Sequence, residues 1–313
     1  MANFLAVLQQ VADELGLPRP TSVTSTDATT RQLAALANRD GQQLMKDVDW
    51  TGLQTEFIIE FGSPLVLAGD TVQGSRVVTN IATASLLPRS NAFSVSGAGM
   101  QIACRGATID SATQLTLTET ADVTQVANPL TFTRDTFDIP TDFDRYIDQT
   151  MWDRRFQWAM IGPTSPQFDE WMRSGIVTVG PRQHWRQVGR DPTVFRIFPP
   201  PTGSGDTPGT LVWQYITNQW VLKQDGTFAS SLTADTDVPT FPDGLLQMGI
   251  KWRFWSVKGF AYAELQEEYN SWVDREKARN GGMSTLRLNA RQPGYLISPS
   301  QVQDGSFPGP GNP

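Results

Sequence analysis

The chain has 313 residues, enough for two domains, and its 32 acidic and 25 basic side chains give a formal net charge of −7. This acidic balance argues against a protein that wraps nucleic acid, but it suits a wall that DNA slides past without sticking. The single cysteine and single histidine exclude an intrachain disulfide and leave a zinc site of the Cys/His kind without ligands. No apolar run approaches the roughly 20 residues of a membrane span, and the N-terminus lacks the pattern of a signal peptide. We therefore expect a soluble protein, made in a cytoplasm, without a membrane partner.

Two amphipathic helices are predicted at the N-terminus. Phe4, Leu8 and Val11 fall on one face of the first helix. Asp27 is a good N-cap for the second helix, which we expect to run to Lys46. Both are expected to cover a long C-terminal helix in a small bundle.

A change of composition marks the next part of the chain. Leu53–Phe61 alternates apolar and polar side chains and is predicted to form a strand. Residues 68–126 are rich in Thr, Ser, Ala, Gly and Val and contain no Lys, Trp or Tyr. We interpret them as a small all-β module inserted into another domain, which costs little loop-closure entropy. Its predicted strands are Arg76–Ile81, Met100–Ile109 and Gln114–Thr118.

The main domain resumes near Leu130. Val194–Phe198 and Leu211–Thr217 alternate and are predicted to be strands of one sheet. Residues 218–242 are predicted to form a long loop. The other expected elements are strands at Leu130–Phe132 and Phe137–Ile139 and a helix at Gln167–Arg173.

One loop of the main domain combines an aromatic ring with charged groups, in the segment Trp152-Asp153-Arg154. Such a set can bind a phosphate or a sugar by stacking and bidentate hydrogen bonds. We favour a structural loop, in which a buried Trp152 and an arginine–aspartate pair hold the chain.

The stretch Leu245–Arg279 is predicted to form one long helix. It contains no proline, and at 1.5 Å per residue it would be about 50 Å long. Because more than half of its circumference is apolar, we expect it to be a central strut, with Arg253 on a narrow polar face. The aromatic residues that we assign to core or subunit packing are Trp252, Trp255, Tyr262 and Tyr269.

The last segment, residues 292–313, is rich in proline and glycine and cannot form the core of a helix or sheet. We interpret it as an extended arm that docks on a partner, and the alternative is a frayed terminus. The docking residues that we assign to the arm are Tyr295, Leu296, Ile297 and Phe307.

No arrangement of catalytic residues is recognisable. His184 lies outside the context of a catalytic triad, so we interpret it as structural. The phosphate-binding and dinucleotide-binding glycine motifs are lacking. Acid pairs such as Asp142 and Asp144 are expected by chance among 32 acidic residues. We predict no catalytic residue, no cofactor and no metal.

Several motifs resemble the head-to-tail adaptors of short-tailed phages, which are also called tail accessory factors, and the N-terminal helices share this resemblance. The inserted module resembles a small β module of many phage structural proteins, and its placement is similar to that of immunoglobulin-like decorations. The minimal adaptor lacks such an insert. The motifs that carry the adaptor resemblance are Phe137–Ile147, Thr150–Arg154, Gly162–Gln167, Gly249–Arg253, Lys258-Gly259 and Tyr262–Glu264.

The patterns and the resemblance together predict an α+β fold. It consists of a helical bundle around one long C-terminal helix, a small antiparallel β part and the inserted all-β domain. The expected domains are an adaptor core (1–61 and 130–291), the inserted module (68–126) and the C-terminal arm (292–313).

The resemblance also implies a structural, non-enzymatic role in the virion. It implies a ring, with twelve copies as the expected number, bound beneath the portal protein and assembled in the host cytoplasm. The ring would line the DNA channel without specific DNA binding and present a platform to the tail nozzle and tail fibre proteins. Two alternatives stay open: a carbohydrate- or fibre-binding virion protein that acts through the β module, and a wall-degrading enzyme carried in the virion.

Overall fold

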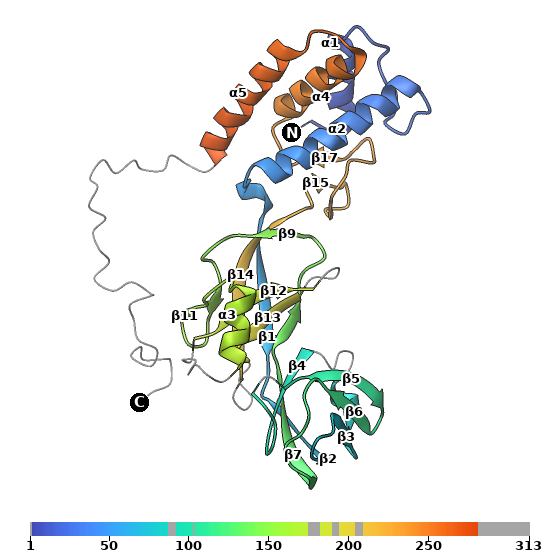
Figure 1. The fold of residues 1–313 in the computed structure, drawn as a ribbon. Coiled ribbons are helices and arrows are strands. Elements are labelled where there is room, and N and C mark those ends of the chain that lie inside the picture. The colour runs from blue at the N-terminus through green and yellow to red at the C-terminus, as the bar shows by residue number, and fades with distance from the viewer. Residues whose placement is uncertain are drawn as a thin grey trace, which may run out of the picture. The chain divides into compact units, whose positions relative to one another are not determined.

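The computed structural model describes residues 2–86, 92–102, 104–174, 182–189, 194–203 and 209–280. As predicted, the fold combines α-helices with antiparallel β-sheets (Figure 1). The chain divides into two compact units, which we call the helical unit and the β unit. The helical unit contains the chain up to Thr55, Asp142–Tyr146, and the chain from Gln214 through the last helix. The β unit contains Glu56–Thr141 and Ile147–Trp213.

Local capping residues determine where the first two helices begin. The Asn3 side chain accepts a hydrogen bond from the backbone N–H of Ala6 at 2.9 Å. The predicted N-cap is confirmed, because the Asp27 carboxylate accepts from the N–H of Thr30 at 2.9 Å. In this unit α1, α2 and α5 all pack against α4. The helices are α1 (Phe4–Glu14), α2 (Ala28–Asp47), α4 (Asp243–Lys258) and α5 (Ala263–Asn280).

The prediction of one long helix over Leu245–Arg279 is wrong, because the chain breaks between α4 and α5 (Figure 1). Gly259 has φ +78°, in the left-handed region that ends helices. The N–H of Phe260 donates to the carbonyl of Trp255 at 3.0 Å, which satisfies a carbonyl of the last turn. Gly259 was the available signal, and the aromatic periodicity that continues across it concealed the break.

Replacing Gly259 with Ala should lower the free energy of unfolding of the helical unit by about 1 kcal/mol, because a Cβ disfavours the left-handed conformation. The added Cβ would meet no atom within 4 Å, so the loss would be conformational. Urea unfolding followed by circular dichroism measures it. The control is Gly62→Ala, where a Cβ also meets no atom within 4 Å and φ is not left-handed. Equal losses in both variants would contradict this explanation.

The predicted loop at residues 218–242 contains a three-stranded sheet, of order β16-β15-β17. Its strands have two residues each, too few for an alternating pattern to be visible in the sequence. Trp220 and Phe241 are fully buried beside them and stack with ring centroids 5.4 Å apart. The Trp220 ring also occupies the space that a Cβ at Gly41 would need. The strands are β15 (Val221–Leu222), β16 (Phe228–Ala229) and β17 (Val238–Pro239).

Val194–Phe198 and Leu211–Thr217 form strands, but the prediction that they share one sheet is wrong. β13 belongs to a sheet of order β12-β13-β8, and β14 pairs with β1, β9 and β10 in another. Their side chains meet instead, since the Phe195 and Trp213 rings lie 4.1 Å apart. Alternation shows which side chains are buried, and it does not show which strands pair. The strands are β1 (Gln54–Phe61), β8 (Thr136–Asp138), β9 (Phe143–Tyr146), β10 (Trp152–Asp153), β11 (Trp158–Ala159), β12 (His184–Val188), β13 (Val194–Phe198) and β14 (Gly209–Thr217).

The predicted inserted module contributes residues to all six strands of a sheet of order β4-β7-β2-β3-β6-β5. The predicted strand Leu130–Phe132 is part of the longer β7 in this sheet, which pairs with β2 from Phe132 to Gln125. The predicted strand Met100–Ile109 begins only at Gly106. The strands are β2 (Leu65–Thr71), β3 (Val77–Thr79), β4 (Phe93–Ser96), β5 (Gly106–Ser111), β6 (Gln114–Leu117) and β7 (Gln125–Arg134).

An apolar cluster that includes Cys104 and Phe132 fills the core of the six-stranded sheet. Burial raises the pKa of the Cys104 thiol to about 11, so this residue is a packing group. The predicted helix at Gln167–Arg173 is confirmed as α3 (Pro166–Arg173), where the Ser165 hydroxyl caps the N–H of Phe168 at 3.2 Å. Two 3₁₀ turns complete the described elements, η1 (Thr51–Leu53) and η2 (Thr83–Leu86).

Candidate partner-binding surfaces

A buried polar cluster, which we call the Asp40 cluster, joins α2 to α4 and α5. Asp40 is fully buried and accepts hydrogen bonds from Arg253 at 2.9 Å and from the Tyr269 hydroxyl at 3.0 Å. Arg253 also donates to Gln43 at 2.8 Å. Placing Arg253 on an exposed polar face was therefore wrong, since only 5% of it is exposed. Gly249 faces the cluster, and a Cβ there would overlap the Asp40 carboxylate.

The electrostatics of the Asp40 cluster follow from its burial. Desolvation raises the pKa of Asp40 to about 6, although Arg253 and Tyr269 favour its charged form. Desolvation and the neighbouring carboxylate also raise the pKa of Tyr269. The cluster thus consists of an ion pair and a neutral phenol at neutral pH. It holds three helices together.

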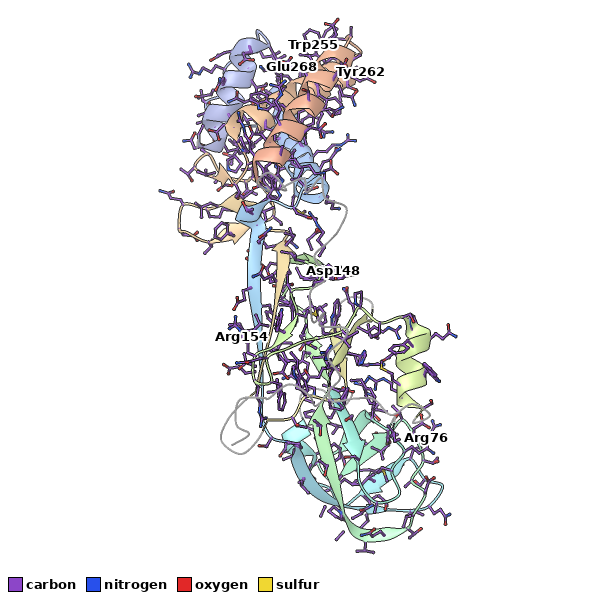
Figure 2. The ribbon with its side chains drawn as sticks, turned by 90° about the vertical axis from the view of Figure 1, so that its left-hand side faces the viewer. Arg76, Asp148, Arg154, Trp255, Tyr262 and Glu268 are labelled. Carbon is purple, nitrogen blue, oxygen red and sulfur yellow. The ribbon has the colours of Figure 1, made fainter. Side chains whose placement is uncertain are left out.

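The turn between α4 and α5 exposes apolar side chains. Val257 and Phe260 are each 58% exposed and Tyr262 is 38% exposed. Trp255 packs edge-on against Phe260, with ring centroids 6.0 Å apart. Figure 2 shows Trp255 and Tyr262 beside this turn. We call these four residues the apolar turn, and adjacent exposed apolar groups of this kind mark an interaction surface.

The other two aromatic residues assigned to packing, Trp252 and Tyr269, lie next to each other. The Trp252 ring is 6.0 Å from that of Tyr269 and 6.4 Å from that of Tyr262. Only 4% of Tyr269 is exposed. The predicted aromatic stripe is therefore divided by the helix break: Tyr269 is buried, the half-buried Trp252 packs against it, and Trp255 and Tyr262 belong to the apolar turn.

The loop at Trp152-Asp153-Arg154 has different contacts from those that we expected. Trp152 is 44% exposed, so a buried tryptophan was the wrong expectation. The buried Asp153 accepts hydrogen bonds from the backbone N–H groups of Arg155 and Phe156, at 2.9 and 3.2 Å. Arg154, labelled in Figure 2, pairs with Glu56 at 2.7 Å and not with Asp153. Asp153 therefore holds this loop through its backbone.

A second buried charged cluster, which we call the Asp135 cluster, lies in the β unit. Arg105 donates to the fully buried Asp135 at 2.8 Å and to Thr136 at 2.6 Å. Arg173 bonds to Asp169 at 3.1 Å and lies 3.9 Å from Asp135. The cluster connects the residue before β5 with β8 and α3. This cluster was not predicted, although an arginine within the apolar stretch Met100–Ile109 was a signal.

The outer face of α3 carries a second exposed aromatic pair. Phe168 is 36% exposed and Trp171 is 49% exposed, and their rings meet edge-on at 5.9 Å. They line a shallow cavity of about 700 Å³ together with Ser165, Gln167, Glu170 and Ser174. His184 packs beside this pair, with its ring 5.8 Å from Phe168.

The chain matches a known protein family. The sequence model of the SU10 adaptor protein family matches residues 97–293, more than half of the chain. The chain belongs to the SU10 adaptor protein family. No curated protein matches it.

The SU10 adaptor match extends over both units of the fold. It begins at Gly97, inside the predicted inserted module, and it includes α3, the loop at residues 152–154 and the apolar turn. As a member of this family, the chain is a phage structural adaptor protein and a component of the virion. Its partners are other capsid or tail components of the phage.

The four residues assigned to the C-terminal arm of this SU10 adaptor, Tyr295, Leu296, Ile297 and Phe307, lie outside the described residues. They also follow the last residue of the family match. In the part of the chain that the structure describes, no group of acidic, histidine and cysteine side chains is arranged to hold a metal ion. No described helix has both the length and the apolar character needed to cross a membrane.

Proposed function

We propose that this SU10 adaptor is a head-to-tail connector of the short-tailed phage type, which forms a ring on the portal protein. The ring, with twelve copies as the expected number, sits in the neck of the virion after assembly in the host cytoplasm. It presents a platform to the tail nozzle and fibre proteins and surrounds the channel through which DNA leaves. The family match over both units is the observation that carries this proposal.

Two physical features support a connector. The apolar turn exposes Val257, Phe260 and Tyr262, and such side chains gain stability when a partner covers them. The net charge of −7 suits a channel wall that must not retain DNA. The division into an adaptor core, an inserted module that resembles immunoglobulin-like decorations and a C-terminal arm belongs to the same proposal.

The experiment is to measure the mass of the purified chain alone and then mixed with the portal protein of the same phage. We expect a complex of fixed stoichiometry, with one ring of adaptor chains on each portal. A chain that shows no binding to the portal at concentrations of about 10 μM, where specific protein contacts are normally populated, would overturn the proposal. The fibre-binding and enzyme alternatives would then be tested next.

Deleting residues 292–313 should weaken binding to the portal by about tenfold or more, because a few apolar anchors carry most of the binding energy of a docked segment. The matched variant keeps the length of the arm and replaces Tyr295, Leu296, Ile297 and Phe307 with Ser. We expect both variants to lose affinity equally, as measured by co-sedimentation with the portal. Unchanged binding in both would remove the arm from the proposal.

A further inference from the structure

The outer face of α2 carries an uncompensated basic stripe. Arg31, Arg39 and Lys46 are exposed and lie on the side of the helix opposite its buried residues. Ala35 and Gln42 fill the positions between them. Within the described part of the chain, none of the three cations forms an ion pair or hydrogen bond through its side chain. We call these three residues the basic stripe.

The outer face of α5 carries charge of the opposite sign. Glu264, Glu267 and Asp274 are exposed and lie opposite Tyr269, the buried residue of this helix. The exposed Glu268 lies at the edge of this face, and the exposed Arg275 follows Asp274. Glu264 and Glu268 are four residues apart, so like charges repel along the helix. Lys251 of α4 pairs with Glu14, and among these four acidic residues Glu268 is the one that acts on its pKa. We call these four residues the acidic stripe.

The basic stripe and, apart from Glu268, the acidic stripe point away from the core of the helical unit. α4 packs against both helices and lies between them (Figure 1). Among the described residues, nothing covers either stripe in a single copy of the chain. Each copy therefore has one basic face, on α2, and one acidic face, on α5. The basic face of one copy is complementary in charge to the acidic face of another copy. Contacts of this heterologous kind generate a closed ring when the rotation between copies closes.

We propose that the basic stripe of α2 in one copy docks on the acidic stripe of α5 in a second copy of this chain. This inference rests on the proposed ring and names the surfaces that form it. Complementary charges mainly set partner choice and register, so the contact should weaken as salt rises. Lys46 of one copy then lies near the acidic side chains of the next.

The test reverses the charge of each stripe in the full chain. Variant one is Arg39→Glu with Lys46→Glu, and variant two is Glu267→Lys with Asp274→Lys. Each alone should lower self-association at least about tenfold at 100 mM salt, because like charges then face each other. The two variants mixed, or all four changes in one chain, should restore association to within about threefold, because opposite charges face again. The control is Arg76→Glu on the β unit, labelled in Figure 2, which should change nothing.

Self-association is measured by sedimentation velocity over a concentration series, for the chain alone and for the chain mixed with the portal protein. Carbodiimide cross-linking of isotopically light and heavy chains then identifies the contact. We expect links between Lys46 and Glu267 or Asp274 that join light to heavy chains. In the mixture of the two variants, every link should join one variant to the other.

The measurements distinguish a missing stripe contact from a missing connector function. Self-association that charge reversal leaves unchanged overturns the stripe contact, even where the portal is bound. Self-association that follows the charge pattern without portal binding upholds the stripes and overturns the connector role. A chain that does not self-associate in either condition overturns the contact.

Discussion

Replacing Gly249 with Ala is expected to lower the free energy of unfolding of the helical unit by about 3–5 kcal/mol, the range for breaking a buried ion pair. The added Cβ would overlap the Asp40 carboxylate. This carboxylate is fully buried and is held by Arg253 and Tyr269, so it cannot move aside and keep its hydrogen bonds. A displaced Asp40 would leave the Arg253 guanidinium buried without its counter-charge, which is the costly outcome.

The same substitution should have the opposite sign once the carboxylate is removed. In a background of Asp40→Ala with Arg253→Met, no buried charge remains to be separated. Gly249→Ala should then stabilise the helix by up to about 1 kcal/mol, because Ala has the higher helix propensity. Urea unfolding followed by the helical circular dichroism signal measures all four proteins. A similar loss in both backgrounds would show that the Asp40 cluster is not the reason for the glycine.

Helix starts were predictable because their causes lie within a few residues. Asp27 caps α2 from three residues before Thr30, and the helix at Gln167–Arg173 appeared at the predicted place. The division of the C-terminal helix was also locally encoded, in Gly259. The break was not predicted, because a periodic aromatic pattern can continue across a turn and still describe two helices.

The buried charged clusters were not predictable in the same way. Arg253 and its partner Asp40 are 213 positions apart in the chain. An arginine on a helix is normally exposed, and only a partner supplied by another helix makes its burial acceptable. Arg105 and Trp152 show the same limit. The chemical character of each residue is visible in the sequence, but contacts with distant segments decide whether it is buried.

The candidate surfaces were predicted only in part. The aromatic residues of the C-terminal helices were assigned to core or subunit packing, and the break at Gly259 determines which of them are exposed. The charged stripes of α2 and α5 could be identified only after the buried face of each helix was known. The family resemblance came from motifs in the chain, and the surfaces of the helical unit required the arrangement of α2, α4 and α5.

Replacing Asp135 with Asn should destabilise the β unit by about 3–5 kcal/mol, because it removes a buried carboxylate from a cluster rich in arginine. Asp135 is fully buried and accepts from Arg105 at 2.8 Å. Burial lowers the pKa of Arg105 to about 10, and repulsion from Arg196 and Arg173 adds to this effect. Without Asp135, the arginines would lose the carboxylate that offsets the cost of burying Arg105 and the repulsion among their guanidinium groups.

The cluster also predicts an order of severity among the variants that test it. Arg105→Met should cost less than Asp135→Asn, because Asp135 would keep Arg173 at 3.9 Å and the repulsion among the arginines would fall. The double variant should recover at least about 1 kcal/mol relative to Asp135→Asn alone, since it leaves no unpaired guanidinium at position 105. Hydrogen exchange at the backbone amides of β7 and β8 reports the stability of this region in the full chain. Equal losses for Asp135→Asn and the double variant would mean that the carboxylate contributes through packing and not through its pairing with Arg105.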